Sequence, residues 1–272
     1  MTGIQMSVAR DSDVSGASSE LRVTLDAERE IAFDSPDHLM PWGTRHDSFV
    51  NHRFNKKLWR LYSATRVVKV LDLGCAGGEF VRTCLNDGHF AVGLEGSDWS
   101  RRHKRSAWAL IEGFLFTCDV TGHFRLSISY QPLKFDVVTA WEFIEHIKEA
   151  DLSIVASNVL AHLAPGGIWI LSITNQEDIV GGVRLHQTVR PKIWWRQRFE
   201  SLGFQSVEGF NSYFAGQFVR GARKDNEVSF HLIFTNDRSK VPGIPAVPLP
   251  HKIFDAWIGS RPHTILNRLI VG

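Results

Sequence analysis

Two carboxylates and an imidazole lie close together in residues 141–146, which read Trp-Glu-Phe-Ile-Glu-His. If a helix begins here, Glu142, Glu145 and His146 share one face, because their spacing is i, i+3 and i+4. His146 could then act as a general base whose ring a carboxylate orients. Alternatively, the three side chains could ligate a divalent ion that binds a substrate hydroxyl and lowers its pKa. A third interpretation is purely structural, since carboxylates are favourable at a helix N-terminus.

A second group of residues suits the binding of a nucleoside. Residues 74–78 (Gly-Cys-Ala-Gly-Gly) follow an apolar segment, and such small residues let the backbone approach a ligand closely. Glu95 ends the next predicted strand, where a carboxylate can accept hydrogen bonds from both hydroxyls of a ribose. Asp119 follows a third predicted strand, where a carboxylate can accept from the amino group of adenine. The three features predict one crevice at the carboxyl ends of the strands.

The loop also distinguishes between two classes of nucleoside ligand. A loop that binds the pyrophosphate of a dinucleotide reads G-x-G-x-x-G, whereas this chain has Gly74-x-Ala76-x-x-Glu79. A carboxylate at Glu79 would repel a pyrophosphate, and Asp72 suits a ligand with a cationic amino acid end. The loop therefore favours S-adenosylmethionine (SAM) over NAD.

The elements that would position these residues follow from the apolar pattern. Short apolar segments alternate with helical patterns from about residue 50 to residue 204, which predicts a parallel sheet with crossover helices. We expect strands at 67–73, 91–95, 114–118, 135–140 and 168–174. We expect helices at 142–163 and 191–202, and a late strand at 228–235 that pairs antiparallel near residue 206. The predicted fold is α/β, a doubly wound and mostly parallel seven-stranded sheet.

The chain is expected to have extensions at both ends of this core. Residues 1–20 are rich in Ser, Asp and Gly and are predicted to be disordered. Residues 21–62 are predicted to form an N-terminal helical lid, in which His38 and Trp42 could either cover a ligand or simply pack. The core domain is expected at 63–238, followed by a C-terminal extension at 239–272.

The segment from about residue 66 to residue 175 resembles the class I SAM-dependent methyltransferases. Their loop pattern D-x-G-x-G-x-G is matched by Asp72, Gly74, Ala76 and Gly78, with alanine in place of the commonest middle glycine. The resemblance implies the Rossmann-like methyltransferase fold, with the loop at the methionine part of SAM, Glu95 at the ribose and Asp119 at the adenine. The cofactor site is then expected to comprise Asp72, Gly74, Cys75, Ala76, Gly78, Glu95, Gly96, Ser97, Cys118, Asp119, Val120, Ala140 and Trp141.

The motif Glu-x-x-Glu-His resembles the metal-binding face of small-RNA 2′-O-methyltransferases and the corresponding motif of ubiquinone-type O-methyltransferases. In the RNA enzymes a further histidine completes the site, and His186 is the candidate for it here, although it is much nearer in sequence than those enzymes place theirs. The predicted catalytic residues are His146, Glu145 and His186. The predicted ligands for Mg²⁺ or another divalent metal are Glu142, Glu145, His146 and His186.

Composition restricts the classes of partner and compartment. The formal net charge is +2, so no overall field demands a nucleic acid or an anionic membrane, and nucleic acid is not the expected partner. No apolar run approaches the roughly 20 residues of a membrane span, and the N-terminus lacks the pattern of a signal peptide. The three cysteines form no disulfide or zinc spacing, which favours reduced thiols in a cytoplasmic protein.

These observations predict an enzyme that methylates the hydroxyl of a small molecule or sugar by in-line transfer. An oxygen nucleophile needs proton removal, which gives His146 or a metal-bound hydroxyl a role. Residues 41–44 and 186–188 make the chain look like bacterial methyltransferases associated with surface polysaccharide synthesis. Two alternatives stay open, an RNA 2′-O-methyltransferase and a SAM-binding protein without catalytic activity.

Overall fold

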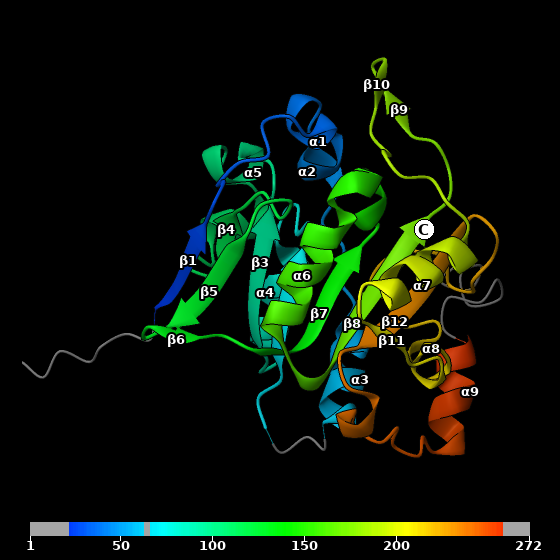
Figure 1. Cartoon of the computed structure of the whole chain (residues 1–272). Coiled ribbons are helices and arrows are strands. Elements are labelled where there is room, and N and C mark those ends of the chain that lie inside the picture. Colours follow the sequence, from blue (N-terminus) through cyan, green and yellow to red (C-terminus); the bar gives the residue numbers. More distant parts are fainter. Residues whose placement is uncertain (1–21, 63–65, 258–272) are drawn as a thin grey trace, which may run out of the picture.

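A seven-stranded sheet forms the centre of the protein (Figure 1). The computed structural model describes residues 22–62 and 66–257, so the disorder predicted for residues 1–20 lies outside the described residues. The strand order is β11-β12-β8-β7-β2-β3-β4, in which the five strands from β8 to β4 run parallel and β12 and β11 pair antiparallel. The strands are β2 (Lys69–Leu73), β3 (Phe90–Glu95), β4 (Leu115–Thr117), β7 (Phe135–Trp141), β8 (Leu163–Thr174), β11 (Gln205–Ser206) and β12 (Ser229–Thr235). The predicted α/β, doubly wound and mostly parallel sheet is confirmed.

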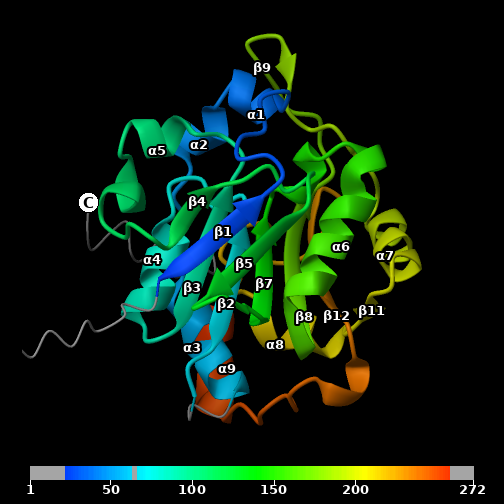
Figure 2. The same cartoon turned by 60° about the vertical axis from the view of Figure 1, so that its left-hand side comes forward.

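Helices cover both faces of the sheet, as Figure 2 shows. Side chains alternate along β8, so Ile168 and Ile170 enter one apolar cluster while Trp169 and Leu171 enter the other. The first cluster is covered by α3 (His52–Leu61), α4 (Glu79–Asn86) and α8 (Gly209–Phe214). The second is covered by α6 (Leu152–His162) and α7 (Lys192–Ser201). Burial on both faces explains why the strands are almost continuously apolar.

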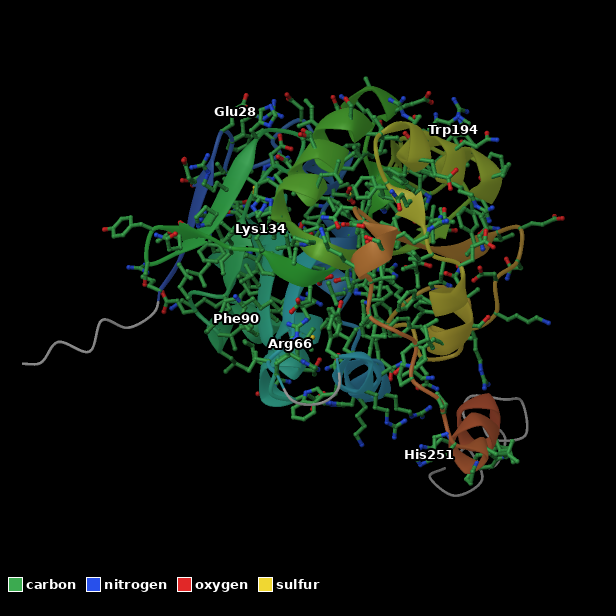
Figure 3. The ribbon with its side chains drawn as sticks, turned by 60° about the horizontal axis from the view of Figure 1, so that its bottom comes forward. Glu28, Arg66, Phe90, Lys134, Trp194 and His251 are labelled. Atoms are coloured by element: carbon green, nitrogen blue, oxygen red, sulfur yellow. The ribbon has the colours of Figure 1, made fainter. Side chains whose placement is uncertain are left out.

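The amino ends of the two central strands are joined by an ion pair. Arg66, just before β2, binds both carboxylate oxygens of Asp136 in β7, at 2.8 and 2.9 Å. Asp136 also accepts a hydrogen bond from the backbone N–H of Lys69. Figure 3 labels Arg66, which lies at the amino ends of the parallel strands and not at their carboxyl ends.

The N-terminal extension contains a strand as well as helices. β1 (Val23–Ala27) pairs antiparallel with β5 (Phe124–Ile128), and β5 pairs with β6 (Gln131–Pro132) in a small second sheet. The extension continues through α1 (Pro36–Leu39) and α2 (Trp42–His46) before α3. The expectation of a wholly helical extension was therefore incomplete, because β1 needs a partner strand about a hundred residues away.

The helix predicted over residues 142–163 is wrong in its first half. Glu142 has a left-handed backbone (φ 46°), and its N–H donates to the backbone oxygen of Ser172. The chain then forms two short 3-10 turns, η2 (Ile144–His146) and η3 (Glu149–Asp151), before α6 begins at Leu152. Glu142, Glu145 and His146 consequently do not share a helical face. The following strand also begins earlier than predicted, at Leu163.

The remaining elements lie at the surface. α5 (Trp99–Arg102) and the 3-10 turn η1 (Ser106–Ala109) follow β3, and a hairpin of β9 (Ile179–Val180) and β10 (Val183–Arg184) follows β8. The C-terminal extension contributes η4 (Arg238–Lys240) and α9 (Leu249–Trp257), and its residues beyond 257 lie outside the described part. None of the helices built from described residues has the length and apolar character that a membrane span requires.

Candidate active site

A cavity of about 450 Å³ lies at the carboxyl ends of the parallel strands. These strand ends point toward the top of Figure 1. From β2 the chain first adds β3 and β4 on one side and then returns to add β7 and β8 on the other. Open α/β sheets bind ligands at such a reversal of strand order, because the connections diverge there and leave a crevice. Residues of the N-terminal extension between Arg29 and Asp47 form the opposite wall of the cavity.

The loop after β2 has the tight backbone that its residue types predict. Gly74 and Gly78 both have positive φ, at 71° and 76°, and a Cβ on Gly74 would collide with the ring of Phe143. A Cβ on Gly78 would lie 2.5 Å from a side-chain carbon of Leu115. Ala76 also adopts the left-handed region (φ 46°), which costs a residue with a Cβ roughly 1 kcal/mol.

Glu95 connects three parts of the cavity wall. Its Oε2 accepts from the backbone N–H of Ala76 at 2.8 Å, and its Oε1 accepts from the backbone N–H of Ser97 at 3.1 Å. The hydroxyl of Thr44, from the N-terminal extension, donates to the same Oε1 at 3.2 Å. Burial raises the pKa of this carboxyl above its ordinary value, while the hydrogen bonds oppose that rise.

Asp119 is likewise held by the N-terminal extension. Its Oδ2 lies 2.9 Å from Nε of Arg29, and its backbone N–H donates to the backbone oxygen of Arg29. Its Oδ1 accepts from both the N–H and the hydroxyl of Thr121. Beside it, the N–H of Ala32 donates to the backbone oxygen of Gly96. The two acidic residues predicted to bind a nucleoside therefore face one cavity and are both fixed in place.

The structure separates the predicted cofactor residues into two groups. Nine line the cavity: Gly74, Ala76, Glu95, Gly96, Ser97, Cys118, Asp119, Val120 and Trp141. The other four, Asp72, Cys75, Gly78 and Ala140, are not among the described residues of its lining.

Asp72 was expected to meet the cationic end of a ligand, but it is not among the described residues that line the cavity. Its Oδ1 accepts a hydrogen bond from the hydroxyl of Thr139 in β7 at 2.7 Å. Burial raises the pKa of Asp72 to about 7, with a smaller opposing effect from that hydrogen bond. The alternation of side chains along β2 directs Asp72 to the face that α3, α4 and α8 cover, because its neighbours Leu71 and Leu73 occupy the other face.

On the β7 side of the cavity, His146 pairs with a carboxylate from the N-terminal extension. Its Nδ1 lies 2.9 Å from Oδ2 of Asp37, at the start of α1. Burial lowers the pKa of His146, but the charge and hydrogen bond of Asp37, together with the charge of Glu145, raise it to about 8. Nε2 is then the ring nitrogen available to a ligand. Sequence reasoning missed Asp37, because no local pattern links residues so far apart.

His186 stands against the ring of His146. The two ring centroids are 4.7 Å apart in an edge-to-face arrangement, and both residues line the cavity. Nδ1 of His186 faces the backbone oxygen of Gln176, so this nitrogen must carry the hydrogen and Nε2 is the acceptor. Burial lowers the pKa of His186, which favours its neutral form.

Glu145 supports this pair from behind the cavity. It is fully buried, and its Oε1 accepts from the backbone N–H of Thr174 at 2.9 Å. Its backbone oxygen accepts from the N–H groups of Gln187 and Thr188, which holds the segment carrying His186. Burial raises the pKa of Glu145 to about 7, and its Oε2 has no hydrogen-bond partner among the described residues.

The predicted metal-ligand set is not assembled. Glu142 forms an ion pair with Arg220, which also pairs with Asp47, and Glu145 is bonded to backbone. Across residues 22–62 and 66–257, no group of three or more His, Cys, Asp or Glu side chains is arranged to hold a metal ion. The left-handed backbone at Glu142 explains this result, because it turns that side chain away from the helical face on which the prediction depended.

Comparison with known proteins identifies the family of the chain. Residues 44–225 match the family model of a methyltransferase domain. The chain belongs to this methyltransferase family. No curated protein sequence matches the chain significantly.

Several solved methyltransferase structures are similar to this methyltransferase. A SAM-dependent methyltransferase from Mesorhizobium loti is 13% identical, with 65% of this chain and 95% of that chain covered and a TM-score of 0.43. An amino pentose methyltransferase of calicheamicin biosynthesis from Micromonospora echinaspora, with SAM bound, is 16% identical (73% and 95% covered, TM-score 0.44). The magnesium protoporphyrin IX methyltransferase from Synechocystis is 14% identical (75% and 96% covered, TM-score 0.47).

Proposed function

We propose that this methyltransferase transfers a methyl group from SAM to a hydroxyl of a small molecule or sugar, with His146 as the general base. The observation that carries the proposal is the His146–Asp37 pair, 2.9 Å apart, in the same cavity as Gly74, Ala76 and Glu95. An imidazole oriented by a carboxylate is suited to accept a proton from an oxygen nucleophile.

Several features of the cavity support SAM as the methyl donor. The tight loop allows close approach of backbone to a ligand, and Glu95 and Asp119 supply carboxylate acceptors on neighbouring strands. Oε2 of Glu95 accepts one hydrogen bond within the protein, which leaves it capacity for a ribose hydroxyl. SAM would supply a methyl group that a cationic sulfonium already activates.

The charge of the cavity also suits a cationic ligand. Its described lining contains eight acidic residues and three basic ones, so negative charge is in excess. The acidic residues are Asp34, Asp37, Asp47, Glu95, Asp119, Glu142, Asp151 and Asp178; the basic ones are Arg29, Lys148 and Arg220.

The proton of the acceptor hydroxyl would go to Nε2 of His146, since Nδ1 is engaged with Asp37. The O–H bond would break as the bond from oxygen to the methyl carbon forms and the bond from that carbon to the sulfur of SAM breaks. S-adenosylhomocysteine would be the leaving group, and the Asp37 carboxylate would stabilise the resulting imidazolium. Burial lowers the pKa of His186, which is in edge contact with His146, so His186 stays neutral and adds no second positive charge beside the imidazolium. Glu145 would act by positioning His186 and not by contact with the acceptor. We propose this base in preference to Mg²⁺, because Glu142 and Glu145 are already engaged.

Calorimetric titration with SAM and S-adenosylhomocysteine, combined with turnover of hydroxylated acceptors, tests the proposal. His146→Ala should lower kcat by roughly 10²- to 10⁴-fold while the Kd for SAM changes little. His52→Ala is the matched control, because His52 is an exposed histidine that also contacts an aspartate, Asp87. Failure to bind either nucleoside would remove SAM from the proposal. Turnover of amines in preference to hydroxyls would overturn O-methylation.

A further inference from the structure

We propose that the methyl acceptor carries an apolar body beside its reactive hydroxyl, and that this body lies on an apolar rim formed by Phe33, Leu39, Trp42 and Ile179. This inference rests on the proposed function, because it assigns the acceptor class of the same site. An alkylated phenol or a sugar attached to an apolar group would fit such a rim, whereas a free sugar would not use it.

The four rim side chains are unusually exposed for large apolar groups. Their exposed fractions are 64% for Phe33, 68% for Leu39, 50% for Trp42 and 63% for Ile179. Single exposed apolar residues are common, but these four are associated with one cavity, since Leu39 and Ile179 follow the cavity-lining residues Asp37 and Asp178 within two positions. Phe33 and Trp42 also line the cavity itself, so the apolar surface continues from the rim to the interior.

The rim joins two elements that are distant in the sequence. Figure 1 shows the β9–β10 hairpin higher than α1 and to its right, and Figure 2 shows β9 above α1. The contact is close, because a Cβ placed on Gly181 in the hairpin turn would lie 3.0 Å from Cε of Met40. At the base of the hairpin, Leu185 and His186 line the cavity. The rim therefore leads directly to the His146–His186 pair.

The β9–β10 hairpin forms a two-stranded sheet that pairs with no other strand of the described residues. Gly181 and Gly182 form its two-residue turn with φ values of 58° and 81°, as a type I′ turn requires. A lone two-stranded hairpin is only marginally stable in water. Ile179 on this hairpin is exposed, so its apolar side chain does not serve the core. Contact with a bound molecule would bury it.

Charge around the rim selects among possible occupants. Asp34 and Asp178 line the cavity beside the rim, and Asp34 is exposed. These carboxylates disfavour an anionic membrane surface, because like charges repel. The continuity of the rim with the cavity favours the acceptor itself over a second protein.

Binding of a homologous series tests this inference on the full chain. Phenol, 4-ethylphenol, 4-butylphenol and 4-hexylphenol would be titrated calorimetrically with and without S-adenosylhomocysteine, with myo-inositol as a polyol that lacks an apolar body. We expect Kd to fall roughly two- to four-fold for each added methylene, and inositol to bind far more weakly. Phe33→Ser and Ile179→Ser should flatten this dependence. Val67→Ser is the control, because Val67 is also exposed but precedes β2 at the opposite edge of the sheet.

A Kd that does not change along the phenol series in the unaltered protein would overturn the inference. A Val67→Ser variant that flattens the dependence of Kd on chain length as much as the rim variants do would also overturn it. Analytical ultracentrifugation and vesicle flotation identify the other occupants. If the rim variants dissociate a dimer or lose binding to neutral vesicles while the phenol series is unchanged, the rim serves those partners instead. Tight S-adenosylhomocysteine binding with a flat phenol series would refute the rim alone and leave the proposed function intact.

Discussion

Nδ1 of His146 lies 2.9 Å from Oδ2 of Asp37, although 109 positions separate the two residues in the chain. The contact brings a carboxylate from the N-terminal extension to an imidazole in η2, the turn that follows the central strand β7. The N-terminal extension therefore both lines the cavity and supplies the carboxylate of this pair. The same segment makes three further contacts with charged residues of the cavity wall. They join Arg29 to Asp119, Thr44 to Glu95 and Asp47 to Arg220.

The first prediction concerns the pH dependence of turnover. His146 must lose its proton to act as a base, so kcat should rise with pH through a midpoint near its pKa of about 8. Asp37→Asn removes the carboxylate that raises this pKa, so the midpoint should move to lower pH. The maximal rate should also fall, because the ring loses its orientation. A pH–rate profile measures both effects. Asp34→Asn, a neighbouring carboxylate of the cavity wall, should leave the midpoint in place.

The second prediction concerns SAM affinity. Glu95→Gln should weaken SAM binding roughly 10-fold or more, because hydrogen bonds to a charged carboxylate are stronger than those to an amide. Calorimetric Kd values provide the measurement. Glu79→Gln is the matched control, since Glu79 begins α4 directly after the loop that Glu95 contacts but accepts hydrogen bonds from Arg82 and Ser106 instead. Equal affinity in the Glu95 variant and the unaltered protein would exclude Glu95 from the ribose site.

The third prediction concerns stability. The folded state raises the pKa of Asp72 from 3.8 to about 7, so folded Asp72 holds its proton where the unfolded chain has lost it. The free energy of unfolding should therefore fall as pH rises from about 4 to 7, by up to about 1.4 kcal/mol per pH unit. Asp72→Asn keeps an acceptor for Thr139 and removes this loss, so its Tm at pH 8 should exceed that of the unaltered protein. Thermal unfolding measures Tm against pH for both proteins. Parallel Tm curves for the unaltered protein and Asp72→Asn across this pH range would contradict the prediction.

The fourth prediction concerns metal dependence. Turnover should be unchanged by EDTA and by added Mg²⁺, because Glu142 is paired with Arg220 and Glu145 is bonded to the backbone of Thr174. Steady-state rates before and after chelation provide the measurement. Loss of activity with EDTA that Mg²⁺ restores would show that these side chains rearrange to bind a metal.

Much of the sheet could be predicted, because its signals are local. Apolar runs and the glycines after residue 73 identify β2 and its loop without reference to distant residues. The face of an individual residue was harder to predict. Asp72 occupies the first position of the expected loop motif, yet its side chain lies on one face of the sheet and accepts a hydrogen bond from the hydroxyl of Thr139.

Residue type and spacing within single segments were enough to predict the parallel sheet, the tight loop at residues 74–78 and the two acidic residues at the ends of β3 and β4. Which side chains meet depends on the packing of distant segments. The contact of His146 with Asp37 closes a long loop, and Glu142, with its left-handed backbone, donates its N–H to the backbone oxygen of Ser172. Such contacts depend on how separate elements pack, which no local pattern encodes.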